Sequence, residues 1–426
     1  MTDLPEAMNK RGNKLYRHGK GNPAHFDDAL DAYRIAAEAG ITNAQFYYAR
    51  MHQYGHGCAK DYEVALQFYQ EAAKSGDRRA WNNLGYMLKN GQGLVPNSWG
   101  SLLYYTQASK MGMAMGSYNI GLHYHTSEGV KDYVKAIQFY TLATEQSQRY
   151  RKAYNQIGRI YENGGHGLEP DLQKAYRAFL LAATFGDEYG VFNLGRFYRD
   201  GKVVDKDLSM AEKLFLEAAH RGHDSAWNTL GNLFYLNRYE QQDFEKALEY
   251  YLKAYKAGKS KYLYRLGYLL KSGPKHLVDP DKAFEVLTAS AELNQPYGIR
   301  SLGYCYAYGI GTEIDRDKAE FLWLTCGGES LIQWHQLGLL MAREDTDQPP
   351  DLALAEAYFK KGTTKDPSGC AECWRRLGYL YRDAPPPKRD YQQAQVCFQQ
   401  AVKLGDEPAK VALSHLENNL LKAAPQ

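Results

Sequence analysis

Histidines and cysteines are the residues of this chain with the greatest capacity for chemistry, and their spacing does not assemble a reactive site. Cys370 and Cys373 form a CxxC pair. A structural zinc site needs four ligands, and no second cysteine or histidine pair accompanies this one. His123 and His125 alternate along a predicted helix, so their side chains point to different faces. We therefore expect no metal and no cofactor.

Catalysis needs a nucleophile, a base and an orienting group that converge, and the sequence offers no such set. His56 and His166 each lie in a glycine-rich GHG segment, where an exposed or capping histidine is expected. The segment GIGTEID at 309–315 lacks the preceding strand and the following GK[ST] of a phosphate-binding loop. We expect no catalytic residue and no enzyme.

Length and composition restrict the class of protein. The 426 residues exceed the roughly 250 to 300 at which a single core stops growing, so the chain forms several domains or a repeat array. A net charge of +3 gives no global basic field for nucleic acid, and no apolar stretch is long enough to span a membrane. The polar N-terminus shows no secretory signal. We expect a cytoplasmic protein with reduced cysteines.

An internal repeat runs through nearly the whole sequence. Its clearest mark is a Leu-Gly or Ile-Gly dipeptide that returns every 35 to 40 residues, with a small residue 15 to 17 positions after each glycine. The glycines are Gly85, Gly121, Gly158, Gly195, Gly231, Gly267, Gly303, Gly338 and Gly378. A fixed period of this length is the signature of a repeat architecture.

Helix boundary signals recur in the same register. Four positions before the small residue stands an Asp or Asn, the type that caps a helix N-terminus. These residues are Asp61, Asn97, Asp132, Asp171, Asp207, Asp243, Asp279, Asp315, Asp351 and Asp390. Eleven positions after the small residue, Gly or Asn is suited to a left-handed helix end. These are Gly40, Gly76, Gly112, Gly186, Gly222, Gly258, Asn294 and Gly405. Each unit therefore reads as helix, loop, helix and tight turn.

One helix pair cannot bury its apolar face alone, so neighbouring units must stack. The sequence predicts an all-α, right-handed superhelical solenoid of about eleven helix-turn-helix repeats with capping helices at both ends. We expect a capping repeat at 1–40, where no Leu-Gly occurs, the repeat array at 41–405, and a closing helix and tail at 406–426. The unit from 329 to 366 is degenerate, but its helices are still expected.

The repeat pattern resembles the Sel-one-like repeat family, whose units are similar to tetratricopeptide repeats. Residues 187–222 carry the pattern as Gly190, Leu194, Gly195, Tyr198, Gly201, Asp207, Ala211, Phe215, Ala218, Ala219 and Gly222. The resemblance covers roughly residues 20–405. It implies a scaffold or adaptor that binds another protein. The alternatives are a bacterial immunity protein that neutralises a secreted toxin, such as a type VI toxin, and, remotely, a hydrolase.

The resemblance to tetratricopeptide-like solenoids implies that the first helix of each unit lines a concave face. Two exposed rows would then follow: an earlier row three residues before each Leu-Gly glycine, and a later row one residue after it. The candidate partner-binding residues are Arg50, Asn82, Tyr86, Tyr118, Asn155, Arg159, Phe192, Arg196, Asn228, Tyr264, Tyr268, Arg300, Tyr304, Arg375 and Tyr379.

The composition of the two rows points to a protein ligand. With Phe46 and Arg50, which flank Ala49 at the equivalent place in the preceding unit, the two rows have twenty positions, and these hold eight aromatics, five arginines, four asparagines and no carboxylate. Aromatics and arginine dominate interface hot spots, and arginine favours carboxylates. We expect an acidic or extended segment of a partner protein, with neither nucleic acid nor membrane as partner. The alternative is that many of the aromatic rings only pack against the neighbouring repeat.

Overall fold

The structure is a computed structural model that describes residues 4–19, 21–236, 242–258, 263–326, 331–343, 349–364, 370–385 and 389–423. In these residues it is built from α-helices, with one short 3-10 helix at Lys275–Leu277 and an isolated bridge between Gly165 and Leu168. The chain divides into two compact units, Met1–Ala226 and Trp227–Gln426. The predicted all-α solenoid of helix pairs is confirmed.

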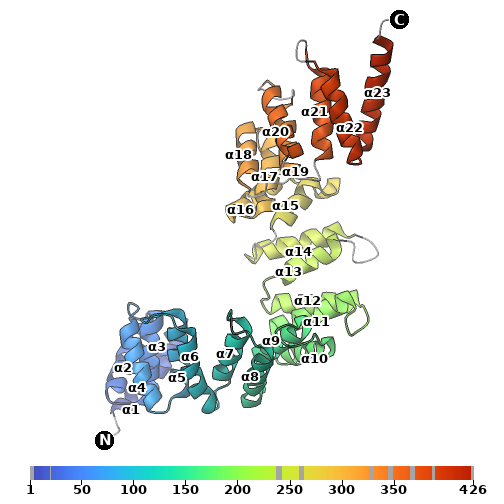
Figure 1. The fold of residues 1–426 in the computed structure, drawn as a ribbon. Coiled ribbons are helices and arrows are strands. Elements are labelled where there is room, and N and C mark those ends of the chain that lie inside the picture. The colour runs from blue at the N-terminus through green and yellow to red at the C-terminus, as the bar shows by residue number, and fades with distance from the viewer. Residues whose placement is uncertain are drawn as a thin grey trace. The chain divides into compact units, whose positions relative to one another are not determined.

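The first unit consists of six helix pairs that follow one another along the chain (Figure 1). Odd-numbered helices are the first helices of the pairs, and even-numbered helices are the second. The helices are α1 (Leu4–Gly19), α2 (His25–Glu38), α3 (Thr42–Tyr54), α4 (Tyr62–Lys74), α5 (Arg78–Asn90), α6 (Ser98–Lys110), α7 (Ala114–Thr126), α8 (Tyr133–Gln146), α9 (Arg151–Asn163), α10 (Leu172–Thr184), α11 (Glu188–Asp200) and α12 (Leu208–His220).

The second unit continues the same alternation and ends on an additional helix, α23, which packs against α22. The degenerate segment forms the predicted helices, α19 and α20. The helices are α13 (Ala226–Tyr235), α14 (Phe244–Lys256), α15 (Leu263–Ser272), α16 (Pro280–Glu292), α17 (Pro296–Tyr308), α18 (Arg316–Thr325), α19 (Leu331–Met341), α20 (Leu352–Thr364), α21 (Ala371–Asp383), α22 (Tyr391–Lys403) and α23 (Glu407–Ala423).

Local side-chain chemistry sets where the second helices begin and end. All ten predicted Asp and Asn caps are confirmed, because each side chain accepts a backbone N–H from the first turn of its helix. These bonds satisfy donors that a helix cannot satisfy internally. The predicted Gly and Asn ends are also confirmed, since all eight residues have positive φ. The sequence therefore predicts these boundaries correctly.

The glycine of the Leu-Gly dipeptide lets the two helices of a pair approach closely. A Cβ built on Gly195 would lie 2.7 Å from the ring of Phe215 on the second helix. The first pair uses the same device, because a Cβ on Gly12 would lie 2.7 Å from the buried ring of Tyr33. Residues 4–38 thus form a pair of the common type although they lack a Leu-Gly dipeptide.

No helix in the described ranges combines the length and apolar character that a membrane crossing requires.

Candidate partner-binding surface

The fifteen candidate residues lie on the first helices, where the repeat register places them, but the two rows differ in exposure. The prediction that the earlier row is exposed is wrong. Asn82, Asn155 and Asn228 are buried, while Tyr118, Phe192, Tyr264, Arg300 and Arg375 are half-buried. The earlier row instead packs at the seam, which is the interface between the first helices of successive repeats.

Several earlier-row side chains in the first unit take part in a polar ladder between consecutive first helices. Asn119 Nδ2 on α7 donates to Asn82 Oδ1 on α5 over 2.9 Å. Asn193 Nδ2 on α11 donates to Asn155 Oδ1 on α9 over 3.0 Å. In each of these hydrogen bonds, which form the rungs of the ladder, the donor stands two residues before the Leu-Gly or Ile-Gly glycine of its own repeat. The acceptor stands three residues before the corresponding glycine of the preceding repeat. These asparagines therefore link repeats to one another.

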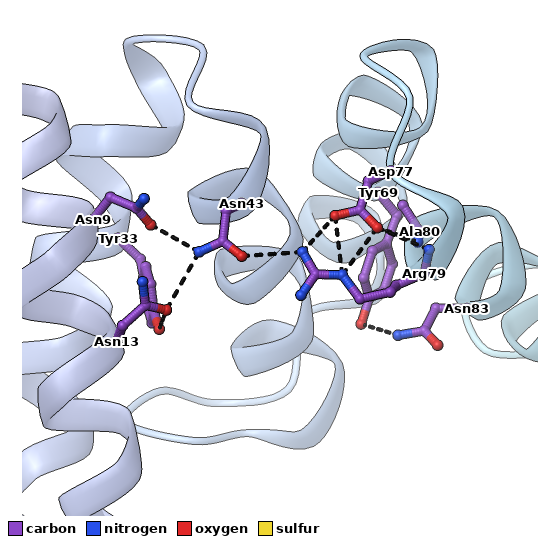
Figure 2. Close-up of polar contacts among 9 residues, drawn as sticks. All are labelled: Asn9, Asn13, Tyr33, Asn43, Tyr69, Asp77, Arg79, Ala80 and Asn83. Atoms are coloured by element: carbon purple, nitrogen blue, oxygen red, sulfur yellow. Dashed lines mark hydrogen bonds and ion pairs between the residues drawn. The ribbon is translucent and has the colours of Figure 1, made fainter. Parts of the chain in front are cut away.

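The ladder has a counterpart at the N-terminal end of the first unit (Figure 2). Asn43 Nδ2 on α3 donates to Asn9 Oδ1 on α1 over 2.9 Å, and Asn43 Oδ1 accepts from Arg79 Nη2 over 3.0 Å. Arg79 also donates from Nε to the carboxylate of Asp77 over 3.0 Å. Its guanidinium carbon lies 4.1 Å from the ring centroid of Phe46. The arginine is thus fully engaged within the protein.

Aromatic members of the earlier row are engaged mainly by other rings. Phe192 stacks on His223 with ring centroids 4.0 Å apart. Tyr118 accepts a hydrogen bond from Gln156 Nε2 over 3.5 Å, and its ring contacts those of Tyr140 and Tyr150. Tyr264 stacks on Tyr297 with centroids 5.0 Å apart. The alternative of ring packing against neighbouring helices therefore holds for these residues.

The later row is more accessible. Tyr86 is 42% exposed and Tyr268 is 47% exposed. Arg159 is exposed and makes no ion pair or hydrogen bond with its side chain in the described part of the chain. Arg50 is half-buried, with its guanidinium carbon 5.9 Å from the ring of Tyr16. These side chains are not fully buried in the core.

The remaining later-row residues are half-buried and have intramolecular partners. Arg196 Nη2 lies 2.9 Å from Glu162 Oε1 on the preceding first helix. The ammonium of Lys271 lies 4.6 Å from the ring centroid of Tyr304, and Arg382 lies 4.8 Å from that of Tyr379. Because Glu162 neutralises Arg196, this arginine is less available to a partner than Arg159.

The two arginines of the earlier row contact neighbouring side chains. Arg300 lies over the ring of Tyr297 at 5.7 Å, and Arg375 Nε lies 3.2 Å from Asp406 Oδ2. Sequence reasoning missed Arg376, which neighbours Arg375 and lines a pocket with Tyr379. The signal that could have found it is its position two residues before Gly378, where the first unit places the ladder donors Asn119 and Asn193.

The alternating histidines of α7 do not converge on one site. His123 Nδ1 lies 3.1 Å from Ser98 Oγ on α6, whereas His125 Nδ1 lies 3.2 Å from Tyr140 OH on α8, so the two rings face opposite sides. Burial lowers the pKa of His125. Cys370 Sγ caps α21 by accepting from the backbone N–H of Cys373 over 3.1 Å. Among the described residues, no three His, Cys, Asp or Glu side chains are grouped to hold a metal ion.

Comparison with known proteins gives consistent matches to one family. Nine segments match the family model described as the Sel1 repeat: residues 42–77, 80–113, 114–148, 151–185, 189–223, 230–259, 260–295, 296–324 and 372–406. No curated protein matches the chain significantly.

Solved structures agree with this match. The chain is 27% identical to a protective antigen present in uropathogenic Escherichia coli strains displaying an SLR fold, over 97% of this chain and 88% of that one, with a TM-score of 0.62. It is also 27% identical to a Sel1 repeat protein from Oxalobacter formigenes, over 58% of this chain and 99% of that one, with a TM-score of 0.52. An immunity protein from Pseudomonas aeruginosa is 18% identical over 51% of this chain and 81% of that one, with a TM-score of 0.37.

Proposed function

We propose that this chain, which belongs to the Sel1 repeat family, is a scaffold that binds a protein partner along the later row of its first helices. The single observation that carries the proposal is the availability of Tyr86, Arg159 and Tyr268. Tyr86 and Arg159 are exposed on first helices of the first unit, and Tyr268 is exposed on a first helix of the second unit. Exposed residues of these types are the ones that dominate protein interfaces.

The chemistry of the later row favours an acidic or extended segment of the partner. The guanidinium of Arg159 has no carboxylate partner in the described part of the chain, so it is free to receive one from outside. A charge-assisted bond between arginine and carboxylate is about twice as strong as a neutral hydrogen bond. In the first unit the exposed ring of Tyr86, in the same row, supplies flat apolar area at low cost in side-chain entropy.

The proposal is tested by affinity capture from the native cells with the full chain, followed by mass spectrometry. The double variant Tyr86→Ala, Arg159→Ala is expected to lower recovery of the specific partner by at least about tenfold, because each residue is expected to be a hot spot. The matched control is Arg177→Ala, which removes an exposed arginine from the second helix α10.

Circular dichroism of both variants checks that the helices remain intact. Recovery of the same partners by the double variant at the wild-type level would contradict the proposed function. A loss with the control as well as with the double variant would also contradict it, since the partner would then not depend on the later row.

A further inference from the structure

A pocket of about 240 Å³ lies between α19, α20 and α21 in the second unit. Its apolar lining includes Leu339 from α19, Ala342 just beyond the end of that helix, Leu352 and Phe359 from α20, and Tyr379 from α21. A volume of this size accommodates one large side chain. The pocket therefore suits an anchoring residue of a bound segment.

Arg376 lines this pocket, and within the described ranges its charge has no ion-pair partner. Its Nε is buried and has no hydrogen-bond acceptor, and its guanidinium forms no ion pair in the described part of the chain. The pocket also contains the carboxylate of Asp383, but Arg382 occupies it through two bonds of 2.7 and 2.8 Å. Among the described residues, no carboxylate therefore forms an ion pair with Arg376 at the pocket wall.

His335 supplies a second unused nitrogen. It lies one helical turn before Leu339 on α19, and its ring is 6.2 Å from the ring of Phe359. Its Nε2 is buried without a partner. Burial and the nearby Arg376 and Arg375 hold the pKa of His335 below its usual value, against the opposing effect of Glu372. A neutral imidazole with its proton on Nε2 is a hydrogen-bond donor.

The repeat register explains why these groups are unused. In the first unit, Asn193 stands two positions before the Leu-Gly glycine of its repeat. It donates to Asn155, which stands three positions before the corresponding glycine of the preceding repeat. Arg376 and His335 hold the same two positions relative to Gly378 and Gly338. The Nε2 of His335 and the Nε of Arg376 have no hydrogen-bond partner among the described residues, so the rung is not formed here. Leaving buried donors unpaired is unfavourable, and an external acceptor would relieve it.

We propose that this pocket binds a carboxylate side chain of a protein partner together with a large apolar residue next to it. The carboxylate would accept from Arg376 and His335, and the apolar residue would enter the pocket against Phe359. The inference rests on the proposed function, because it specifies the chemistry of the partner's segment.

The test uses the full chain and fluorescein-labelled octapeptides of Gly and Ser with Glu-Leu or Glu-Phe at the centre. Their twins carry Gln in place of Glu. Fluorescence anisotropy at low ionic strength is expected to show the Glu peptides binding about tenfold more tightly than the Gln twins. Arg376→Gln is expected to abolish this preference. Arg177→Gln, an exposed arginine of the first unit, should leave it unchanged.

His335→Leu is a second variant that keeps the test valid if Arg376→Gln fails to fold, and it is expected to weaken the Glu peptides about threefold. Equal binding of Glu and Gln peptides, or an undiminished preference in Arg376→Gln, would overturn the inference. The peptide readout does not involve Tyr86 or Arg159. A failure of the proposed function at the later row is therefore distinguishable from a failure at this pocket.

Discussion

The first unit and the helices α19 and α21 carry polar side chains at the same two positions of the repeat. In the first unit these side chains form hydrogen bonds to each other, and on α19 and α21 they do not. In the first unit, Asn82 meets Asn119 and Asn155 meets Asn193, so donor and acceptor satisfy each other across the seam. On α19 and α21, a histidine and an arginine occupy these positions, and the buried Nε2 of His335 and Nε of Arg376 have no hydrogen-bond partner among the described residues.

The difference teaches that a position in the repeat does not by itself determine a residue's role. A buried polar side chain stabilises the stack when the next repeat supplies its complement, and it becomes a candidate binding group when the next repeat does not. In both places the backbone register is unchanged. The two places differ in whether a donor on one repeat faces an acceptor on the next.

The largest expected effect comes from breaking a closed rung of the ladder. Asn155→Leu removes the acceptor of Asn193 Nδ2, and both asparagines are buried. The variant is expected to lower the free energy of unfolding by about 2 kcal/mol, because a buried donor loses its partner. Urea denaturation followed by circular dichroism measures the change. Asn163→Leu, at the exposed end of the same helix, is the matched control. Equal stability of Asn155→Leu and wild type would refute the structural role of the ladder.

A double-mutant cycle sharpens the comparison by isolating one rung. Asn82→Ala and Asn119→Ala each remove one partner of the 2.9 Å hydrogen bond between α5 and α7. The double variant is expected to be more stable than the sum of the single effects predicts, with a coupling energy of about 1 kcal/mol. Urea denaturation of the four proteins gives this coupling. Strict additivity would show that the bond contributes nothing to stability.

The smallest effect is expected to have the opposite sign. His335→Leu replaces an unpaired buried nitrogen with an apolar side chain beside Phe359. The free energy of unfolding is expected to rise by about 0.5 kcal/mol at neutral pH, because no hydrogen bond is lost. The same urea titration measures it. A loss as large as that of Asn155→Leu would mean that the two regions are built alike, and the contrast between them would not stand.

Much of the fold was predictable because its signals are local. The Asp at position 207 caps α12 by accepting from the Met210 N–H, three residues away. Gly222 ends the same helix with a φ of 92° that other residues rarely adopt. The exposure of the candidate rows was less predictable, since most side chains of the earlier row pack at the interface between successive repeats. Exposure on a first helix depends on how closely the next pair packs.

The sequence by itself determined the helix pairs and their boundaries, because these rest on conformational and hydrogen-bond preferences within one repeat. Only the tertiary structure decided which polar side chains are free. Arg159 and Arg196 hold equivalent positions, yet of the two only Arg196 forms an ion pair with Glu162. Such pairings join residues about one repeat apart, and they depend on side-chain distances that the register does not contain.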